Sequence, residues 1–382
     1  MNALESLKEL VSDFAKDRGY INYLKVRDNV LAMMALPTKD DSIPSSYWSE
    51  ELEGFDYMLD ASPLIVRKLR EHCYHITGLR SYEYRHHHAH KARAFANKLE
   101  ALRGEDKNDL FLPEERELGG FGHNIDGQLV NIDTLKFYES LIAMDHGELL
   151  QNLQSQVSNG KRPIVVEIGG GWGGFGYQIK KIVPEITYVI IDLPQTLLFS
   201  ATYLKTLFPQ AVVFMYGESD LDDAMTNLER YDFVFLPHYF VDDHQLPRID
   251  LAVNMISFQE MTTGQVSGYI KWLWESECPQ VYSYNRGRSP HNSQLSNVPD
   301  LLRYGYGLQE INVLPVPYTV LNVPATGDPV EKVVLPKDAK AIARHMLSNA
   351  LRSVKKKAVG PSSTDYRHMI GKRKLEFRGT GK

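Results

Sequence analysis

Hydrophobic positions in the first third of the chain recur at helical spacing. Near the N-terminus the apolar residues that share one helical face are Leu4, Leu7, Leu10, Val11 and Phe14. Further helical stretches are predicted over residues 64–75 and 86–102, and the SIPSSYWSE segment interrupts the helices as a loop. Strand-like alternation is absent here, so we predict a helical N-terminal module that, with a turn-rich connector, occupies residues 1–132.

The pattern changes at residue 164, where short β-rich runs alternate with helical segments. The runs are IVVEI, TYVIID, AVVFMY, DFVFLP, DLAVNMI and QVYSY. Continuous apolar strands separated by helices predict a mostly parallel sheet covered on both faces, which is an α/β fold. The DFVFLP run adds one strand to the simplest count, as an inserted or an edge strand. We expect INVLPVPYTVLNVP to supply the final antiparallel strands.

The boundaries of this α/β domain follow from the flanking segments. Asp133 is predicted to cap the helix that opens the domain, which we assign to residues 133–330. The remaining residues, 331–382, form a tail that starts helical and becomes basic. We interpret this tail as a solvated terminus.

Charge and cysteine content exclude several classes of protein. The 382 residues carry a net charge of -5, which argues against non-specific binding to nucleic acid. No apolar run approaches the roughly 18 residues of a membrane span. The two cysteines, Cys73 and Cys278, lie far apart and build neither a disulfide framework nor a zinc motif, so we expect a cytoplasmic protein.

The run IVVEIGGGWGG is a buried strand that enters a glycine-dense turn. At the carboxyl end of a first parallel strand, such a turn forms the floor of a nucleotide-type site. Gly169, Gly171 and Gly174 fit the dinucleotide pattern, whereas Glu167 with Gly169, Gly171 and Gly173 fits the acid and G-x-G-x-G of S-adenosylmethionine (SAM) sites. A carboxylate beside the loop would repel a pyrophosphate but suits the cationic amino-acid part of SAM.

A second carboxylate, Asp192, ends the run TYVIID. An acid at the tip of the second strand can accept hydrogen bonds from both ribose hydroxyls, in NAD as in SAM. Asp192 therefore favours an adenosine-containing ligand without separating the two cofactors.

Several motifs together resemble the sugar O-methyltransferase family, whose members depend on SAM and are often associated with surface polysaccharide or glycosylated natural-product pathways. The motifs are EIGGGWGGFGYQIKK, IDLPQ, NMISFQEM and YSYNR, with ELGGFGHNIDGQLVNIDTLKFY upstream. The resemblance covers roughly residues 110–325, and SFQEM and YNR carry the sugar assignment. It implies a Rossmann-like class I methyltransferase fold, with a seven-stranded sheet that has one antiparallel strand. It also implies that SAM lies among Glu167, Gly169, Gly170, Gly171, Asp192 and Leu193.

Methyl transfer to a sugar hydroxyl requires alignment of the two reacting atoms and removal of the hydroxyl proton. Glu260, in the first turn after DLAVNMI, is the first candidate for the base, and Gln259 for a positioning hydrogen bond. His238, which follows DFVFLP, is the second candidate. Arg286 and Arg288 could bind an anionic group of the acceptor, such as a phosphate.

Other interpretations stay open from the sequence alone. The glycine pattern is also compatible with an NAD-dependent oxidoreductase, and a non-catalytic SAM-binding protein would share the cofactor residues. No metal site is predicted, because the histidine run from His86 to His90 lacks nearby residues that would complete a ligand set. The expected partner is a small-molecule or glycan acceptor, and the sequence does not distinguish a monomer from a homo-oligomer.

Overall fold

The computed structural model describes residues 16–37, 43–288, 292–295, 297–321 and 365–378, together with residues 5, 12, 13 and 39. The sequence predicts helices within residues 1–15 and at the start of the tail after residue 331. Both of these segments lie largely outside the described residues. Among the described helices, none has both the length and the hydrophobicity that a bilayer crossing requires.

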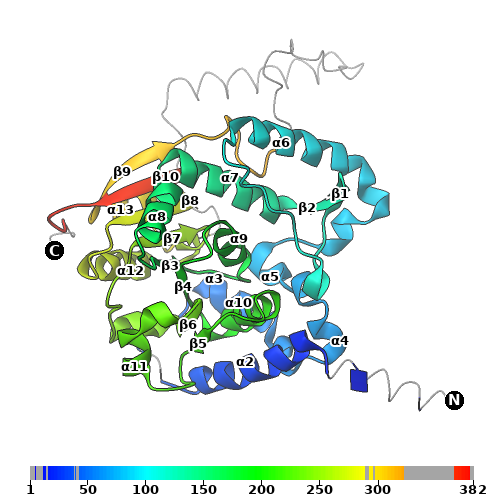
Figure 1. Cartoon of the computed structure of the whole chain (residues 1–382), viewed down its shortest axis with the longest axis horizontal. Coiled ribbons are helices and arrows are strands. Elements are labelled where there is room, and N and C mark those ends of the chain that lie inside the picture. The colour runs from blue at the N-terminus through cyan, green and yellow to red at the C-terminus, as the bar shows by residue number, and fades with distance from the viewer. Residues whose placement is uncertain are drawn as a thin grey trace, which may run out of the picture.

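An eight-stranded sheet forms the centre of the protein (Figure 1). Its strands, in spatial order, are β5 (Val213–Met215), β6 (Phe233–Pro237), β4 (Thr187–Asp192), β3 (Ile164–Ile168), β7 (Leu251–Met255), β8 (Gln280–Arg286), β10 (Tyr366–Arg373) and β9 (Tyr306–Ile311). The strands from β5 to β8 are parallel, and β10 runs antiparallel to both of its neighbours. Apart from the added β6, this is a doubly wound Rossmann-like order, which confirms the predicted fold class.

Two details of the sheet differ from the prediction. The DFVFLP strand lies between β4 and β5 as an inserted strand, so the sheet has eight strands instead of seven. The final antiparallel strand was expected within residues 311–324, but the described part of that segment is irregular after Ile311. Tyr366–Arg373 supplies that strand instead, because this segment fills the space between β8 and β9, where its backbone pairs on both sides.

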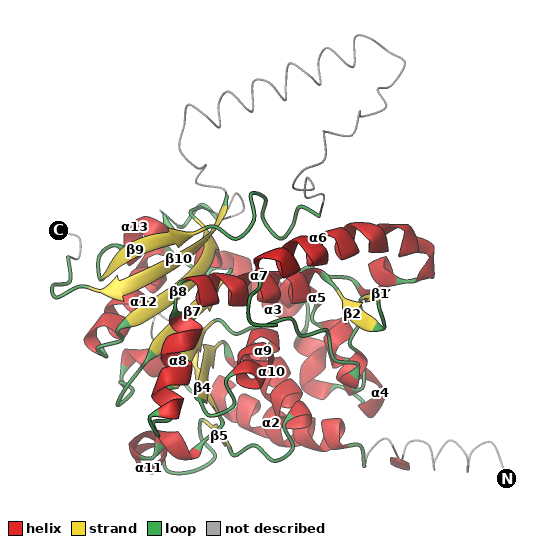
Figure 2. Ribbon diagram, turned by 45° about the horizontal axis from the view of Figure 1, so that its top comes forward, coloured by secondary structure: helices red, strands yellow, loops and turns green. Residues whose placement is uncertain are grey.

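The two faces of the sheet are covered by different helices (Figure 2). Alternate strand residues belong to opposite hydrophobic clusters, as Tyr188 and Ile190 do on one face and Val189 and Ile191 on the other. One face packs against α7 (Ile132–His146), α8 (Leu149–Ser158), α9 (Gly174–Ile182) and α10 (Pro194–Leu207). The other packs against α11 (Leu221–Thr226), α12 (Thr263–Glu275) and α13 (Val298–Leu302).

The N-terminal segment is mostly helical and shares the core of the first face. Its helices are α2 (Arg18–Met34), α3 (Ser46–Glu53), α4 (Pro63–Val66), α5 (Tyr74–Thr77) and α6 (Ala92–Glu105), with 3₁₀ turns at Asp56–Asp60, Leu69–His72, Ser81–Tyr84 and His86–Lys91. Val26 and Val30 of α2 belong to the same buried cluster as Leu197 of α10. In Figure 1, α2 lies alongside α10, so the N-terminal helices have no separate core.

A buried ion cluster lies where two local details differ from the prediction. Arg70 donates to Glu114 at 2.7 Å and to Asp133 at 2.6 Å, and its guanidinium lies 3.9 Å from the Trp172 ring. Residues 64–75 form three short helical segments instead of one helix, and Arg70, in the middle segment, is buried in the core. Asp133, which the sequence predicts as the cap of the helix, accepts hydrogen bonds from Arg70 and Lys136 instead. The cap of α7 is Asn131, two residues earlier.

The connector contains a short hairpin, β1 (His123–Ile125) paired with β2 (Gln128–Val130). Its turn residues, Asp126 and Gly127, both have positive φ, 51° and 85°. A two-residue turn of this kind matches the twist of a hairpin and favours an Asp-Gly pair. The hairpin directly precedes α7 and ends on the residue before its cap.

Candidate functional site

A cavity of about 800 Å³ opens at the carboxyl ends of β4, β3, β7 and β8. This is the edge at which a doubly wound sheet binds ligands, next to the point where the strand order reverses between β3 and β7. Segments of α3 and α5 from the N-terminal helices also line it. The volume lies in the upper part of the range of about 300–1,000 Å³ for small-molecule sites, so it can hold a cofactor together with an acceptor.

The glycine loop between β3 and α9 lines the cavity with Gly169, Gly170 and Gly171. Gly169 has a φ of +73°, and a Cβ there would lie 1.9 Å from the hydroxyl oxygen of Ser257. Gly171 also has positive φ, +56°, and its amide donates to Asp192 at 2.8 Å. Glycine is required here because the loop bends sharply and touches the turn after β7.

Two buried carboxylates lie next to this loop. Glu167, on β3, is 2% exposed and accepts a hydrogen bond from the Tyr188 hydroxyl at 3.0 Å. Asp192 ends β4 and accepts hydrogen bonds from the amides of Gly171 and Leu193, at 2.8 and 2.7 Å. Burial raises the pKa of Glu167 to about 8 and that of Asp192 to about 6.

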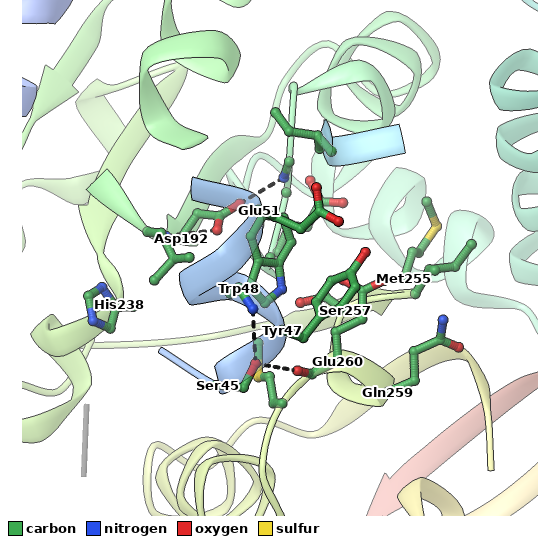
Figure 3. Close-up of a pocket in the computed structure, with 18 of the residues that line it drawn as sticks. Ser45, Tyr47, Trp48, Glu51, Asp192, His238, Met255, Ser257, Gln259 and Glu260 are labelled. Carbon is green, nitrogen blue, oxygen red and sulfur yellow. Dashed lines mark hydrogen bonds between the residues drawn. The ribbon is translucent and has the colours of Figure 1, made fainter. Parts of the chain in front are cut away.

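A third carboxylate, Glu260, follows β7 in the short turn Phe258–Glu260 and is half-buried at the cavity wall. Burial raises its pKa to about 8, against the opposing charge of Lys136. Figure 3 shows Glu260 close to Trp48 and Tyr47, and Ser45 donates to its backbone carbonyl at 2.7 Å. The N-terminal segment is therefore hydrogen-bonded directly to the turn that carries Glu260.

Side-chain amides build this turn. Asn254 on β7 donates to the Ile168 carbonyl at 2.8 Å and accepts from Asn285 on β8 at 2.8 Å. The Gln259 carbonyl accepts from the backbone amide of Arg286 at 2.9 Å. The NMISFQEM and YSYNR motifs thus meet in space, and Gln259 holds the ends of β7 and β8 together.

In the part of the chain that the structure describes, no side-chain cation pairs with these three carboxylates. Within the described residues, Glu167, Asp192 and Glu260 form no ion pair with a lysine, arginine or histidine. Lys136 lies close enough to lower the pKa of Glu167 and Glu260, but its ammonium is bonded to Asp133 at 2.9 Å. Two buried acids and one half-buried acid around one cavity fit a ligand that carries positive charge.

His238 also lines the cavity, at the end of β6. Because β6 neighbours β4 on the side away from β3, His238 and Glu260 lie on opposite sides of the glycine loop. Figure 3 shows the same separation, with Asp192 between them. The two candidate bases of the sequence analysis therefore do not share one place in the cavity.

The aromatic wall of the cavity is not among the features that the sequence predicts. Tyr47 and Trp48 lie on α3, which begins in the SIPSSYWSE segment that was expected to be a loop. The signal was Ser45, which caps this helix by accepting from the Trp48 amide at 3.4 Å. Tyr318 and Tyr366, from parts of the chain after the parallel strands, also line the cavity.

Metal ligation finds no support in the described ranges. No group of three or more His, Cys, Asp or Glu side chains in them could hold a metal ion. The histidine run from His86 to His90 lies in a 3₁₀ turn, in which residues four apart do not share a face.

Comparison with solved structures finds similarity to methyltransferases. The methyltransferase domain of bacterial CtHen1-CN has a TM-score of 0.32 and 9% sequence identity, over 59% of this chain and 98% of that domain. The pyocyanin biosynthetic protein PhzM has a TM-score of 0.31 and 14% identity, over 61% of this chain and 57% of its own. An O-methyltransferase family protein from Burkholderia thailandensis has a TM-score of 0.31 and 12% sequence identity, over 75% of this chain and 70% of its own.

No protein-family model matches the chain, and no curated protein matches it in sequence. The strand order therefore defines the fold, and the residues of the cavity are what indicate a function.

Proposed function

We propose that this protein is a SAM-dependent O-methyltransferase that acts on a hydroxyl of a sugar or a glycosylated small molecule. The observation that carries the proposal is the set of buried cavity carboxylates around a glycine loop, without a cationic partner in the described chain. SAM carries a sulfonium and an ammonium, so it would supply the missing positive charge. A pyrophosphate-containing dinucleotide would instead meet like charge at Glu167.

The order of the strands suggests how the cofactor would lie. Asp192 on β4 would accept hydrogen bonds from the ribose hydroxyls, and its amide partners already orient the carboxylate. Glu167 on β3, with Gly169 and Gly171, would hold the amino-acid half, directly or through water. The adenosine half then lies toward β6, where His238 would contact it, and the reacting end lies toward β7.

When bound, SAM supplies an electrophilic methyl group on its sulfonium. Glu260 would accept the proton of the acceptor hydroxyl, because it follows β7 and its pKa of about 8 suits a general base at neutral pH. Gln259 would act through the backbone, by fixing the turn that carries Glu260. The aromatic rings of Tyr47, Trp48 and Tyr366 would support a sugar ring by stacking.

Calorimetric titration of the purified protein with SAM and with S-adenosylhomocysteine (SAH) tests the cofactor. We expect saturable binding by the wild type and a loss of at least about 100-fold in affinity for Asp192→Ala, since two ribose hydrogen bonds of about 1.5 kcal/mol each disappear. Binding of NADH in place of SAM would contradict the proposal and favour an oxidoreductase.

Turnover separates an enzyme from a non-catalytic SAM-binding protein. Release of SAH is measured with a panel of sugars and glycosides, for the wild type and for Glu260→Gln. SAM binding with no turnover of any acceptor, or turnover that Glu260→Gln leaves intact, would overturn the assigned chemistry. The separated, unpaired and buried cysteines are consistent with a cytoplasmic reaction, which we retain as part of the proposal.

A further inference from the structure

Arg286 differs from the other groups at the functional edge of the sheet, because it brings positive charge to the cavity. It is the last residue of β8, and the Gln259 side chain fixes its backbone amide at 2.9 Å. Its guanidinium carbon lies 4.4 Å from the centre of the Tyr366 ring on β10. Arg286 and Tyr366 are direct partners in the β8–β10 register, so the guanidinium rests on an aromatic face that itself lines the cavity.

The guanidinium has no polar partner within the described chain. Its Nε is buried without a hydrogen bond, and neither a hydrogen bond nor an ion pair of its terminal nitrogens occurs among these residues. A buried donor left unpaired costs free energy unless a ligand satisfies it. Because the Arg286 guanidinium stacks on Tyr366 through its face, the N–H donors at the edge of the guanidinium plane remain available to a ligand.

The second long basic side chain of the cavity, Lys136, is already neutralised. Its ammonium binds Asp133 at 2.9 Å, and the other oxygen of Asp133 binds the buried Arg70 at 2.6 Å. Likewise His75 on the cavity wall is bonded to Glu51 at 2.8 Å. Of the lysines and arginines that line the described cavity, Arg286 alone lacks a carboxylate partner.

Acidic and basic side chains therefore lie at different strand ends along this edge of the sheet. From β4 through β3 to β7 the cavity presents Asp192, Glu167 and Glu260, and at β8 it presents Arg286. The acidic part coincides with the proposed cofactor and base. The basic end lies beyond Glu260, one strand further along the sheet from the proposed base, and neighbouring strands are only about 4.8 Å apart.

We propose that the acceptor carries an anionic group, a carboxylate or a phosphate, which Arg286 binds through its donor fork while the sugar ring packs near Tyr318 and Tyr366. The inference rests on the proposed methyltransferase function and narrows its substrate class to acidic or phosphorylated sugars. A guanidinium fits both oxyanions with two parallel hydrogen bonds, whereas a neutral sugar would leave it unpaired. Arg286 is thus a specificity-determining residue.

Binding of matched sugars to the full-length protein tests this assignment. Methyl glucuronide and glucose 1-phosphate serve as the two anionic probes, and methyl glucoside is the neutral control. Each is titrated calorimetrically into wild type, Arg286→Gln and Arg286→Lys, with and without saturating SAH. Arg288→Gln is the matched control. The sequence suggests Arg288 as a second anion-binding residue, but in the structure it is exposed and does not line the cavity, although it lies only two residues from Arg286.

We expect at least one anionic probe to bind the wild type at least about tenfold more tightly than the neutral control, as one charge-assisted pair of about 1.5 kcal/mol requires. Arg286→Gln should abolish this preference, Arg286→Lys should retain part of it, and Arg288→Gln should retain all of it. Preference for the glucuronide identifies a carboxylate acceptor, and preference for the sugar phosphate identifies a phosphorylated one.

Equal binding of all three probes, or an anion preference that survives Arg286→Gln, would overturn the inference. The titrations without SAH keep this outcome separate from failure of the proposed function. If SAH does not bind but the anionic preference depends on Arg286, the methyltransferase assignment fails while the anion site stands. A circular dichroism spectrum of each variant verifies that the fold is retained.

Discussion

The buried carboxylate of Glu167 is expected to destabilise the free protein, and Glu167→Gln tests this directly. Glu167 has no cationic partner among the described residues, and burial raises its pKa from 4.5 to about 8. Between these two pH values the unfolded chain has released the proton that the folded chain still holds. The folded state therefore binds more protons, and the free energy of unfolding falls as the pH rises through this range.

The size of the effect follows from the same pKa values. A tenfold change in proton affinity is worth about 1.4 kcal/mol. The rise in the pKa of Glu167 from 4.5 to about 8 therefore corresponds to about 5 kcal/mol once Glu167 is ionised. Relaxation and water entry lower this value, and we expect Glu167→Gln to raise the free energy of unfolding by about 2–3 kcal/mol above pH 8. The amide keeps an oxygen that can accept from Tyr188, so the hydrogen bond is retained.

Urea-induced unfolding of the ligand-free protein, followed by tryptophan fluorescence across the titration range, measures this difference. The difference in the free energy of unfolding between variant and wild type should increase as the pH rises and become constant above pH 8. Saturating SAM should close it, because a cation beside ionised Glu167 stabilises only the wild type. A variant that is less stable than the wild type, or a gap that does not change with pH, would refute the reasoning.

Three further substitutions test other parts of the site. Gly169→Ala should cost about 1–3 kcal/mol of stability, because of its positive φ, and should weaken SAH binding, as thermal unfolding and calorimetry can check. Arg70→Met leaves two buried carboxylates without this partner and should lower the free energy of unfolding by about 3–5 kcal/mol, measured with urea. Glu260→Gln should lower kcat by about 10²- to 10⁴-fold while SAH binding persists, so an unchanged kcat would exclude it as the base.

The sheet and its glycine loop could be predicted from the sequence because their signals are local. Short continuous apolar runs such as IVVEI and TYVIID, separated by helical segments, are typical of strands covered on both faces. Glu167, one residue before the end of the first run, and Asp192, at the end of the second, reach the cavity because the carboxyl ends of parallel strands share one edge. The roles assigned to them remain predictions.

Pairing between distant segments depended on tertiary structure. Tyr366–Arg373 carries basic residues at its end and was assigned to a tail, yet it fills the space between β8 and β9. Likewise, only packing against the sheet brings α3, with Tyr47 and Trp48, to the cavity. Local propensity does not contain these contacts, because they join positions that lie far apart in the chain.

The charge state of the site was also decided by the fold. In the sequence, Arg70 and Arg286 are equivalent cations, and Glu114 and Glu167 are equivalent acids. In the structure Arg70 meets Glu114 in the core, whereas Arg286 and Glu167 line one cavity without ionic partners in the described chain. Burial and distance, which only the tertiary structure sets, determine which charges are neutralised and which remain available to a ligand.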